Sequence, residues 1–416
     1  MWKMAKTSEG LALSKEKESS WFNSKFLLIC LSSIFTNLAN YMYLLTQSWL
    51  VVRLFNLDSY LGIVLMVATI PRVVLMTIGG VVADRISRSK IMFCCNILRS
   101  FIVIIMTILL LCGYLKINYL LVFVLLFGIL DAFFWPANSS ILPFIVNENG
   151  LGKANSIFYI VNQASIIAGP MIAGLIISMG SIEIAFITIS VFLLLGGVLV
   201  YPVRISKINQ EKKKTSPFQD LVQGLKYVTN TPFLYTLILV NSVISFLLIG
   251  PINTSIPLIV DRLHGSPIEL SFLESSLAVG MILGGLILSW ISLKKKRGTM
   301  IIISAFFMGI SVFLLSQVGL LWQGMFLLCF LGFFMSLSGV LLMTVIQERV
   351  DSQKIGRVMS LISTSTQGLV PLAYGIVALI LSFNISIFQI LLVSGSLISV
   401  VMIIVFLTAK ELREIR

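Results

Sequence analysis

Charged residues are scarce in this chain, forming 11% of its 416 residues, whereas they form about 25% of an average soluble domain. Histidine occurs once and cysteine five times, and the cysteines lack the spacing of a disulfide framework or a zinc site. The sequence contains no Gly-x-x-x-x-Gly-Lys-Ser/Thr loop to cradle a nucleotide. We therefore expect neither a soluble globular protein nor an ATP-driven pump. We also expect no enzyme activity, no metal site and no cofactor.

Hydrophobic residues are abundant instead, at 58% of the chain. They occur in long runs, and about 20 mostly apolar residues suffice for a helix to cross a bilayer. The sequence therefore predicts an all-α membrane protein with 12 transmembrane helices. The predicted spans are residues 26–50, 59–83, 91–113, 119–142, 154–179, 182–202, 232–260, 269–293, 299–317, 321–346, 357–382 and 385–408.

Lysine and arginine lie almost entirely between alternate spans. With both termini placed in the cytoplasm, 25 of the 30 cations fall in cytoplasmic segments, three in outside loops and two inside spans. Positive residues mark the cytoplasmic loops of membrane proteins, so we expect both termini in the cytoplasm. Residues 1–25 lack the apolar core of a cleavable signal peptide.

Two weak internal matches indicate that the chain consists of two related halves. A Gly-cation-x-x-Ser pattern at 152–156 recurs 204 residues later at 356–360, and a Gly-Gly pair at 79–80 recurs 205 residues later at 284–285. The similar offsets indicate duplication of six helices in parallel orientation, a recurrent plan among secondary transporters. For either match alone, a general preference of small residues and cations for loops is the alternative. The expected segments are a cytoplasmic N-terminal segment 1–25, a six-helix bundle 26–202, a cytoplasmic linker 203–231, a six-helix bundle 232–408 and a cytoplasmic tail 409–416.

The turn after the second predicted span has a distinctive charge pattern. Its residues Gly80, Asp84, Arg85, Arg88 and Lys90 resemble the signature loop of the major facilitator superfamily, although Ser87 stands where that family often has glycine. The resemblance implies a transporter with two six-helix bundles that rock against each other. It also implies that this loop latches the cytoplasmic ends of the two bundles in the outward-open state.

Shorter stretches resemble one branch of that superfamily, the macrolide-efflux and enterobactin exporters. They include Pro136-Ala137, Gly250-Pro251 and Gln347-Glu348-Arg349-Val350, in the same order over about 300 residues. This resemblance implies a proton-driven exporter in a bacterial plasma membrane. Composition and spacing alone imply only a polytopic transporter.

Four charged residues lie inside predicted spans and away from the first and last two positions of each span: Arg72, Arg99, Asp131 and Glu274. A charge at the bilayer centre costs about 2.5–3.5 kcal/mol on insertion scales, so each one needs an explanation. The similar depths predict that Asp131 pairs with Arg72 or Arg99. This pair is either a structural contact or part of a proton site, because desolvation favours a neutral carboxylate and a nearby arginine favours an ionised one. Glu274, near the outer end of span eight, is either an interfacial charge or a second proton site, and we expect one of the two carboxylates to couple transport to protons.

Asp84 also has a purely structural interpretation. A carboxylate at the start of a helix accepts hydrogen bonds from unpaired backbone N–H groups, so Asp84 is expected to cap span three as well as to serve the latch. Gly169-Pro170 predicts a bend in span five, because proline removes one backbone hydrogen bond. Glycines at 280, 284 and 285 predict a close helix contact.

Polar and aromatic residues in spans one, four and seven are candidates for a substrate cavity, because the resemblance implies that these spans line it. They are Asn37, Asn40, Phe134, Trp135, Asn241 and Asn253. Amides in hydrocarbon need partners, and together with aromatic rings they would suit an amphipathic organic solute.

We therefore expect a monomeric secondary exporter of drug-like or siderophore-like molecules that works in the lipid bilayer, uses protons and binds no nucleic acid. A carrier for metabolite uptake or exchange is the alternative within transport. A sensor or scaffold that transports nothing is the alternative outside it.

Overall fold

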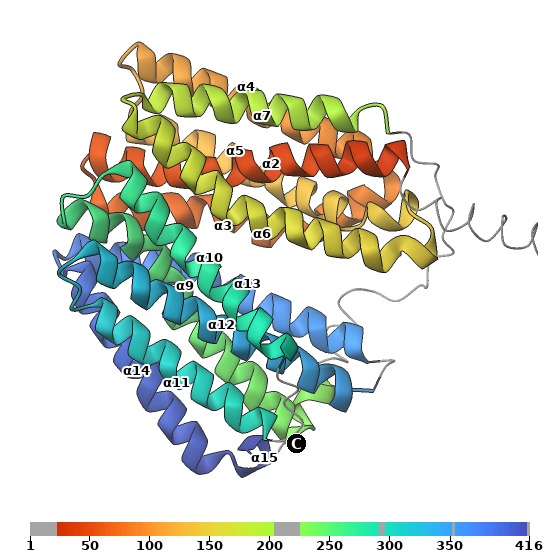
Figure 1. The fold of residues 1–416 in the computed structure, drawn as a ribbon, viewed down its shortest axis with the longest axis vertical. Helices are drawn as coiled ribbons and strands as arrows, with labels where there is room; N and C mark the ends of the chain where they lie inside the picture. Colours follow the sequence, from red (N-terminus) through yellow and green to blue (C-terminus); the bar gives the residue numbers. More distant parts are fainter. Residues whose placement is uncertain (1–22, 204–224, 291–295, 352–353, 414–416) are drawn as a thin grey trace, which may run out of the picture. The chain divides into compact units, whose positions relative to one another are not determined.

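The computed structural model describes residues 23–203, 225–290, 296–351 and 354–413. Over these ranges the ordered elements are helices, with no β-strand, and 12 helical segments are long and apolar enough to cross a membrane. This confirms the predicted all-α membrane fold. The spans are α2 (Ser24–Trp49, continued by the π-helical η1, Leu50–Leu54), α3 (Asp58–Arg85), α4 (Arg88–Leu111), α5 (Ile117–Ser139), α6 (Glu148–Ser178), α7 (Ile182–Val200), α9 (Pro232–Arg262), α10 (Pro267–Trp290), α11 (Arg297–Leu315), α12 (Leu321–Arg349), α13 (Ile355–Ser382) and α14 (Ile387–Thr408) (Figure 1). Two short elements, η2 (Leu142–Phe144) and α15 (Lys410–Arg413), complete the described helices.

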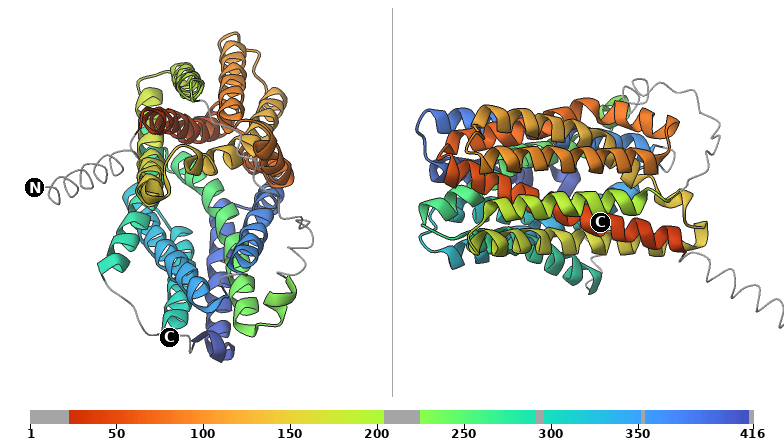
Figure 2. Two further views of the ribbon diagram at one scale, coloured as in Figure 1. Left: turned by 90° about the vertical axis from the view of Figure 1, so that its right-hand side faces the viewer. Right: turned by 90° about the horizontal axis from the view of Figure 1, so that it is seen from above.

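The chain divides into two compact units. Unit 1 comprises Met1–Thr46, Pro71–Ile172 and Met179–Gln210, and unit 2 comprises Gln47–Ile70, Ala173–Ser178 and Glu211–Arg416. Three helices of the N-terminal half, α2, α3 and α6, therefore contribute one end each to unit 2. The spans of each unit run alongside one another (Figure 2). Most of the predicted linker 203–231 and of the N-terminal segment 1–25 lies outside the described residues.

Helix α4 shows how a membrane span distributes its side chains. Its face toward α5 and α7 buries Asn96, Arg99 and Ser100, whereas its opposite face exposes large apolar residues such as Phe101 and Ile108. Figure 1 shows α4 alongside α7. In water this arrangement would be unstable, but lipid solvates the apolar face while polar groups find partners inside. The polar side chains of α4 therefore lie in the interior of unit 1.

Glycine permits very close helix contacts in unit 2. A methyl group added at Gly280 would lie 1.9 Å from the backbone oxygen of Cys329, and one at Gly332 would lie 2.1 Å from that of Leu277. The backbones of α10 and α12 therefore touch directly at these positions. Gly284 contributes to the same contact, with Phe333 O at 2.5 Å, whereas Gly285 has only an ordinary contact. The predicted packing face is thus confirmed for the first two of its three glycines.

The predicted bend at Gly169-Pro170 stays a prediction, since both residues lie inside the continuous helix α6. Gly169 has a clear packing role instead. A methyl group there would lie 2.7 Å from Cβ of Tyr41 on α2 and 3.2 Å from the backbone oxygen of Leu38. Glycine at this position therefore allows α6 to approach α2 closely within unit 1.

Candidate functional site

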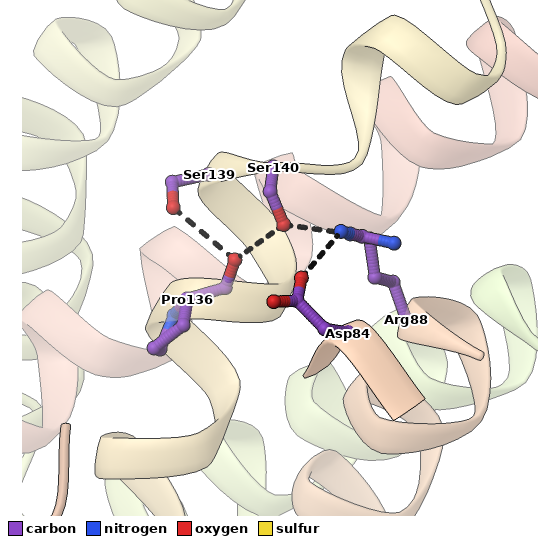
Figure 3. Close-up of polar contacts among 5 residues, drawn as sticks. All are labelled: Asp84, Arg88, Pro136, Ser139 and Ser140. Atoms are coloured by element: carbon purple, nitrogen blue, oxygen red, sulfur yellow. Dashed lines mark hydrogen bonds and ion pairs between the residues drawn. The ribbon is translucent and has the colours of Figure 1, made fainter. Parts of the chain in front are cut away.

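The turn between α3 and α4 is organised around Arg88, the first residue of α4. Its Nη2 lies 3.3 Å from Asp84 Oδ1, and its Nε donates a hydrogen bond of 2.7 Å to Ser140 Oγ (Figure 3). Ser140 Oγ in turn donates to the backbone oxygen of Pro136 at 2.7 Å. The guanidinium also stacks 4.0 Å from the centre of the Phe144 ring. Arg88 thereby ties the ends of three spans, α3, α4 and α5, together at one end of unit 1.

Asp84 does not cap span three, contrary to the structural interpretation of the sequence. It lies in the last turn of α3, while Ser87 occupies the N-cap position of α4 and makes no side-chain capping bond. The Asp84 side chain is 59% exposed, against 14% for Arg88. The predicted second span ends at residue 83, two residues before the end of α3, because α3 continues through Asp84 to Arg85.

The remaining signature residues have open surroundings. Arg85 and Lys90 are exposed. A methyl group at Gly80 would meet no atom within 4 Å, whereas one at Gly79 would meet the Ala132 backbone oxygen at 2.2 Å. Packing inside unit 1 therefore explains Gly79 and leaves Gly80 without a packing explanation.

The predicted partner of Asp131 is Arg99. Its Nη2 forms an ion pair with Asp131 Oδ1, which connects α4 to α5. The Arg99 side chain is fully buried and lies between two aromatic rings, with its Cζ 5.1 Å from the centre of Phe127 and 4.6 Å from that of Phe134. Its Nε and Nη1 have no hydrogen-bond partner among the described residues. Asp131 is 21% exposed, so the carboxylate is the accessible member of the pair.

Arg72 is not part of this pair. Its guanidinium lies 5.0 Å from the centre of the Trp135 ring. In the ranges that the structure covers, no hydrogen bond or ion pair joins it to another side chain. Among the described residues of unit 1, Arg99 thus has a carboxylate as its counter-charge at membrane depth, and Arg72 has none.

Glu274 lies eight residues into α10, in unit 2, and is half-buried. Within the described parts of the chain its carboxylate has neither a hydrogen bond nor an ion pair. The two intramembrane carboxylates therefore differ: Asp131 is held by an arginine, and Glu274 is not. Sequence alone could not distinguish them, because a partner on another helix has no fixed spacing.

The residues predicted to line a cavity have varied environments. In unit 1, Asn37 is almost fully buried, and the side-chain amide of Asn40 is buried without a partner among described residues. Phe134 is 1% exposed and belongs to the hydrophobic core, where it contacts Arg99 instead of lining an open surface. In unit 2, the Asn253 amide donates to the Tyr374 hydroxyl at 2.7 Å, and Asn241 is half-buried.

Two ion pairs in unit 2 were missed by the sequence analysis. Arg53 Nε lies 2.7 Å from Asp261 Oδ1, and its Nη2 donates to the backbone oxygen of Gly265 at 3.1 Å. Arg297, the first residue of α11, pairs with Glu348 at the end of α12. The sequence contained one usable signal: Arg53 and Asp261 lie 208 residues apart, close to the repeat offset, which places them at corresponding ends of the first span of each half.

The second ion pair changes the interpretation of the repeat. The sequence indicates that the loop after span eight has lost its carboxylate, since Ser289 stands in the acidic position. In the structure, however, the cation that begins α11 binds a carboxylate at the end of α12, much as Arg88 binds Ser140 beyond the end of α5. The partner of the cation therefore comes from the following span. As for metals, no group of three potential ligands occurs among the residues searched, which are the described ones.

Comparison with known proteins gives a consistent result. The model of the family described as Major Facilitator Superfamily matches residues 29–374. Macrolide efflux protein A of Enterococcus faecalis is 32% identical over 294 residues, covering 68% of this chain and 88% of that protein. Enterobactin exporter EntS of Escherichia coli O1:K1 is 23% identical over 298 residues, covering 69% and 68%. The solved structure of the nucleoside transporter NupG has a TM-score of 0.75 at 12% identity, covering 94% of this chain and 100% of that one, which indicates a common fold.

Proposed function

The chain belongs to the Major Facilitator Superfamily, and we propose that it exports amphipathic small molecules from a bacterial cell in exchange for protons. Its family, its 12 candidate spans and its efflux-protein relatives identify a multi-pass membrane transporter of small molecules. We further propose an outward direction of transport, an amphipathic substrate, coupling to protons and a cytoplasmic position of both termini.

The outward direction of transport is supported by the similarity to a protein named for macrolide efflux. The alignment with macrolide efflux protein A spans 88% of that relative. An alignment of 294 residues is longer than either predicted six-helix bundle, so it includes parts of both. A macrolide is a large molecule with both apolar and polar groups, and a cavity lined by aromatic rings and a few amides would suit such a solute. Trp135 and Asn40 remain our candidates for this lining.

Glu274 is the stronger candidate for the proton carrier. An intramembrane carboxylate without a counter-ion is costly to keep ionised, and Glu274 has no partner in the described chain. Asp131, by contrast, is held by its ion pair with Arg99. We therefore assign proton uptake and release to Glu274 and a structural role to the pair Asp131–Arg99.

The signature loop is proposed to act as a latch for the cytoplasmic side, as the resemblance implies. Two observations support this role. Asp84 is mostly exposed although it contacts Arg88, so one face of the carboxylate remains available. Gly80 has open space where a side chain would be, so another segment of the chain could approach the α3 backbone there. Both features are unexplained by packing within unit 1.

The coupling proposal is tested by flux measurements with purified protein in proteoliposomes. A macrolide is the probe, and its movement is measured with and without an imposed pH gradient. We expect the gradient to drive accumulation by the wild type and by Arg99→Met/Asp131→Asn, but not by Glu274→Gln. Glu269→Gln, a change in the first turn of the same helix, is the matched control. If Glu274→Gln retained gradient-driven accumulation, the assignment of the proton site would be wrong.

Direction is tested in cells. Expression of an exporter lowers the accumulated amount of a macrolide, whereas expression of an uptake carrier raises it. Unchanged accumulation together with no flux in proteoliposomes would favour a sensor or scaffold. The predicted cytoplasmic termini are tested separately, by protease accessibility of tags placed at each end in right-side-out and inverted vesicles.

A further inference from the structure

The spans of the N-terminal half carry an excess of positive charge. Within them, away from the span ends, the ionisable side chains of formal charge are Arg72, Arg99 and Asp131. Asp131 is bound to Arg99, so one positive charge, that of Arg72, is left over. Charges at membrane depth are costly and are retained where they pair with another group or face a water-filled cavity. The ion pair between Asp131 and Arg99 therefore leaves the charge of Arg72 unexplained.

Arg72, Trp135, Tyr41 and Asn162 lie on four different helices of unit 1. The Arg72 guanidinium lies 5.0 Å from the ring centre of Trp135 on α5. Tyr41 on α2 lies within electrostatic range of the guanidinium. The Tyr41 hydroxyl donates a hydrogen bond of 3.3 Å to Oδ1 of Asn162 on α6. All four side chains are partly exposed.

The chemistry of this cluster fits an anion. A guanidinium has five N–H donors in one plane and no acceptor. Contact with an aromatic face leaves the in-plane donors available, and these match the two oxygens of a carboxylate. Because Oδ1 of Asn162 accepts from Tyr41, the amide nitrogen of Asn162 remains as a further donor. Donors and an aromatic face lie together, and no carboxylate of the described chain is bound to them.

From this arrangement we propose that Arg72, with Trp135, Tyr41 and Asn162, forms a binding subsite for the acidic group of an amphipathic, aromatic substrate. The group recognised is a carboxylate or a similarly shaped anion. Trp135 holds the guanidinium and stacks on the apolar part of the ligand, while Arg72 pairs with the charge. This proposal rests on the proposed transport function and adds a substrate class to it.

Comparison with Arg99 argues against a merely structural role. Arg99 is fully buried between two rings and has a carboxylate partner. Arg72 has one aromatic contact, partial exposure and no carboxylate among the residues described. A structural arginine at membrane depth is expected to be buried and paired with a carboxylate, as Arg99 is. If Arg72 served only to pack against Trp135, its loss would change stability and leave ligand preference unchanged.

The test compares two ligands that differ only in charge. Pyrenebutyrate is the carboxylate probe, and its uncharged amide is the control ligand. Equilibrium binding to the full chain in a non-ionic detergent is measured for wild type, Arg72→Gln, Arg72→Lys and Lys116→Gln. Lys116, an exposed cation at the other end of α5, controls for general electrostatic attraction.

We expect the wild type and Lys116→Gln to bind the carboxylate at least about tenfold more tightly than the amide, the size of one charge-assisted hydrogen bond. Arg72→Gln should bind both ligands equally, and Arg72→Lys should show an intermediate preference. Retained binding of the amide shows that a variant is folded; if Arg72→Gln failed to fold, the reduced preference of Arg72→Lys would decide.

The subsite is refuted if the wild type shows no preference, or if Arg72→Gln retains it. These outcomes are distinct from failure of the proposed function. Binding is measured without transport, so absence of macrolide export by the wild type would refute the exporter and leave the subsite standing. Conversely, macrolide export with no preference for the carboxylate would refute only the subsite.

Discussion

The pair Asp131–Arg99 allows an asymmetric prediction about stability. Removing one member of a buried ion pair usually costs about 3–5 kcal/mol, because the other charge is left buried. The two members of this pair differ in exposure, 21% for Asp131 and 0% for Arg99. They also differ in chemistry, since a carboxylate can take up a proton, whereas arginine stays charged in proteins. The cost of each single change should therefore depend on which residue remains.

Asp131→Asn should be the more damaging change. It leaves a fully buried guanidinium whose Nε and Nη1 already have no partner among the described residues, so we expect the full cost of about 3–5 kcal/mol. Arg99→Met fills the space between Phe127 and Phe134 with an apolar chain and leaves a carboxylate that can become neutral. Its cost should be about 1–3 kcal/mol, the penalty of one unsatisfied polar group.

The double variant Arg99→Met/Asp131→Asn separates the cost of leaving one charge unpaired from the cost of losing the ion pair itself. Replacement of a buried ion pair by uncharged groups is often close to neutral, so the double variant should be within about 1 kcal/mol of the wild type. The measurement is unfolding in mixed micelles titrated with SDS, followed by tryptophan fluorescence. If Arg99→Met were as destabilising as Asp131→Asn, or if the two costs added in the double variant, the reasoning from exposure and charge would be refuted.

Three further predictions follow from contacts in the two units. Gly280→Ala should destabilise the protein by about 1–3 kcal/mol, because its methyl group would overlap a backbone oxygen; Gly285→Ala on the same helix should be neutral or slightly stabilising in the same SDS titration. Arg53→Gln should cost only about 0–1 kcal/mol of stability, because its ion pair with Asp261 is one-third exposed. An equal cost of Asp261→Asn and no additivity in the double variant would show that the two residues act together, whereas a cost above about 2 kcal/mol would contradict the prediction. Asp84→Asn should lower transport while the amount in the membrane, measured by immunoblot, stays near normal; a loss explained wholly by missing protein would contradict the latch.

The membrane fold could be predicted in detail because its signal is local. Each span is a run of apolar residues long enough to cross the bilayer, so all 12 predicted spans have a counterpart in the structure. The pairing of Asp131 with an arginine was also predictable, because few groups at that depth can satisfy a carboxylate. The choice of Arg99 over Arg72 was not, since it depends on how α4 is rotated about its axis.

The errors of the sequence analysis have a common cause. The role of Asp84 was inferred from its place in a charged turn, but the turn begins later because α3 continues to Arg85. Phe134 was grouped with Trp135 as a cavity residue, although adjacent residues on a helix point about 100° apart, and only Trp135 is partly exposed. Arg53 was counted for topology, and its partner Asp261 was therefore overlooked. In each case the missing information was the direction of a side chain in three dimensions.

The direct backbone contact between α10 and α12 has a mechanical consequence. Because Gly280 and Gly332 bring the two backbones into direct contact, we expect α10 and α12 to move together as one unit. Glu274 lies near the start of α10, and Glu348 lies at the far end of α12, a helix of 29 residues and therefore about 43 Å long. We therefore expect a movement of α10 near Glu274 to shift the ion pair that Glu348 forms with Arg297 at the opposite end of α12.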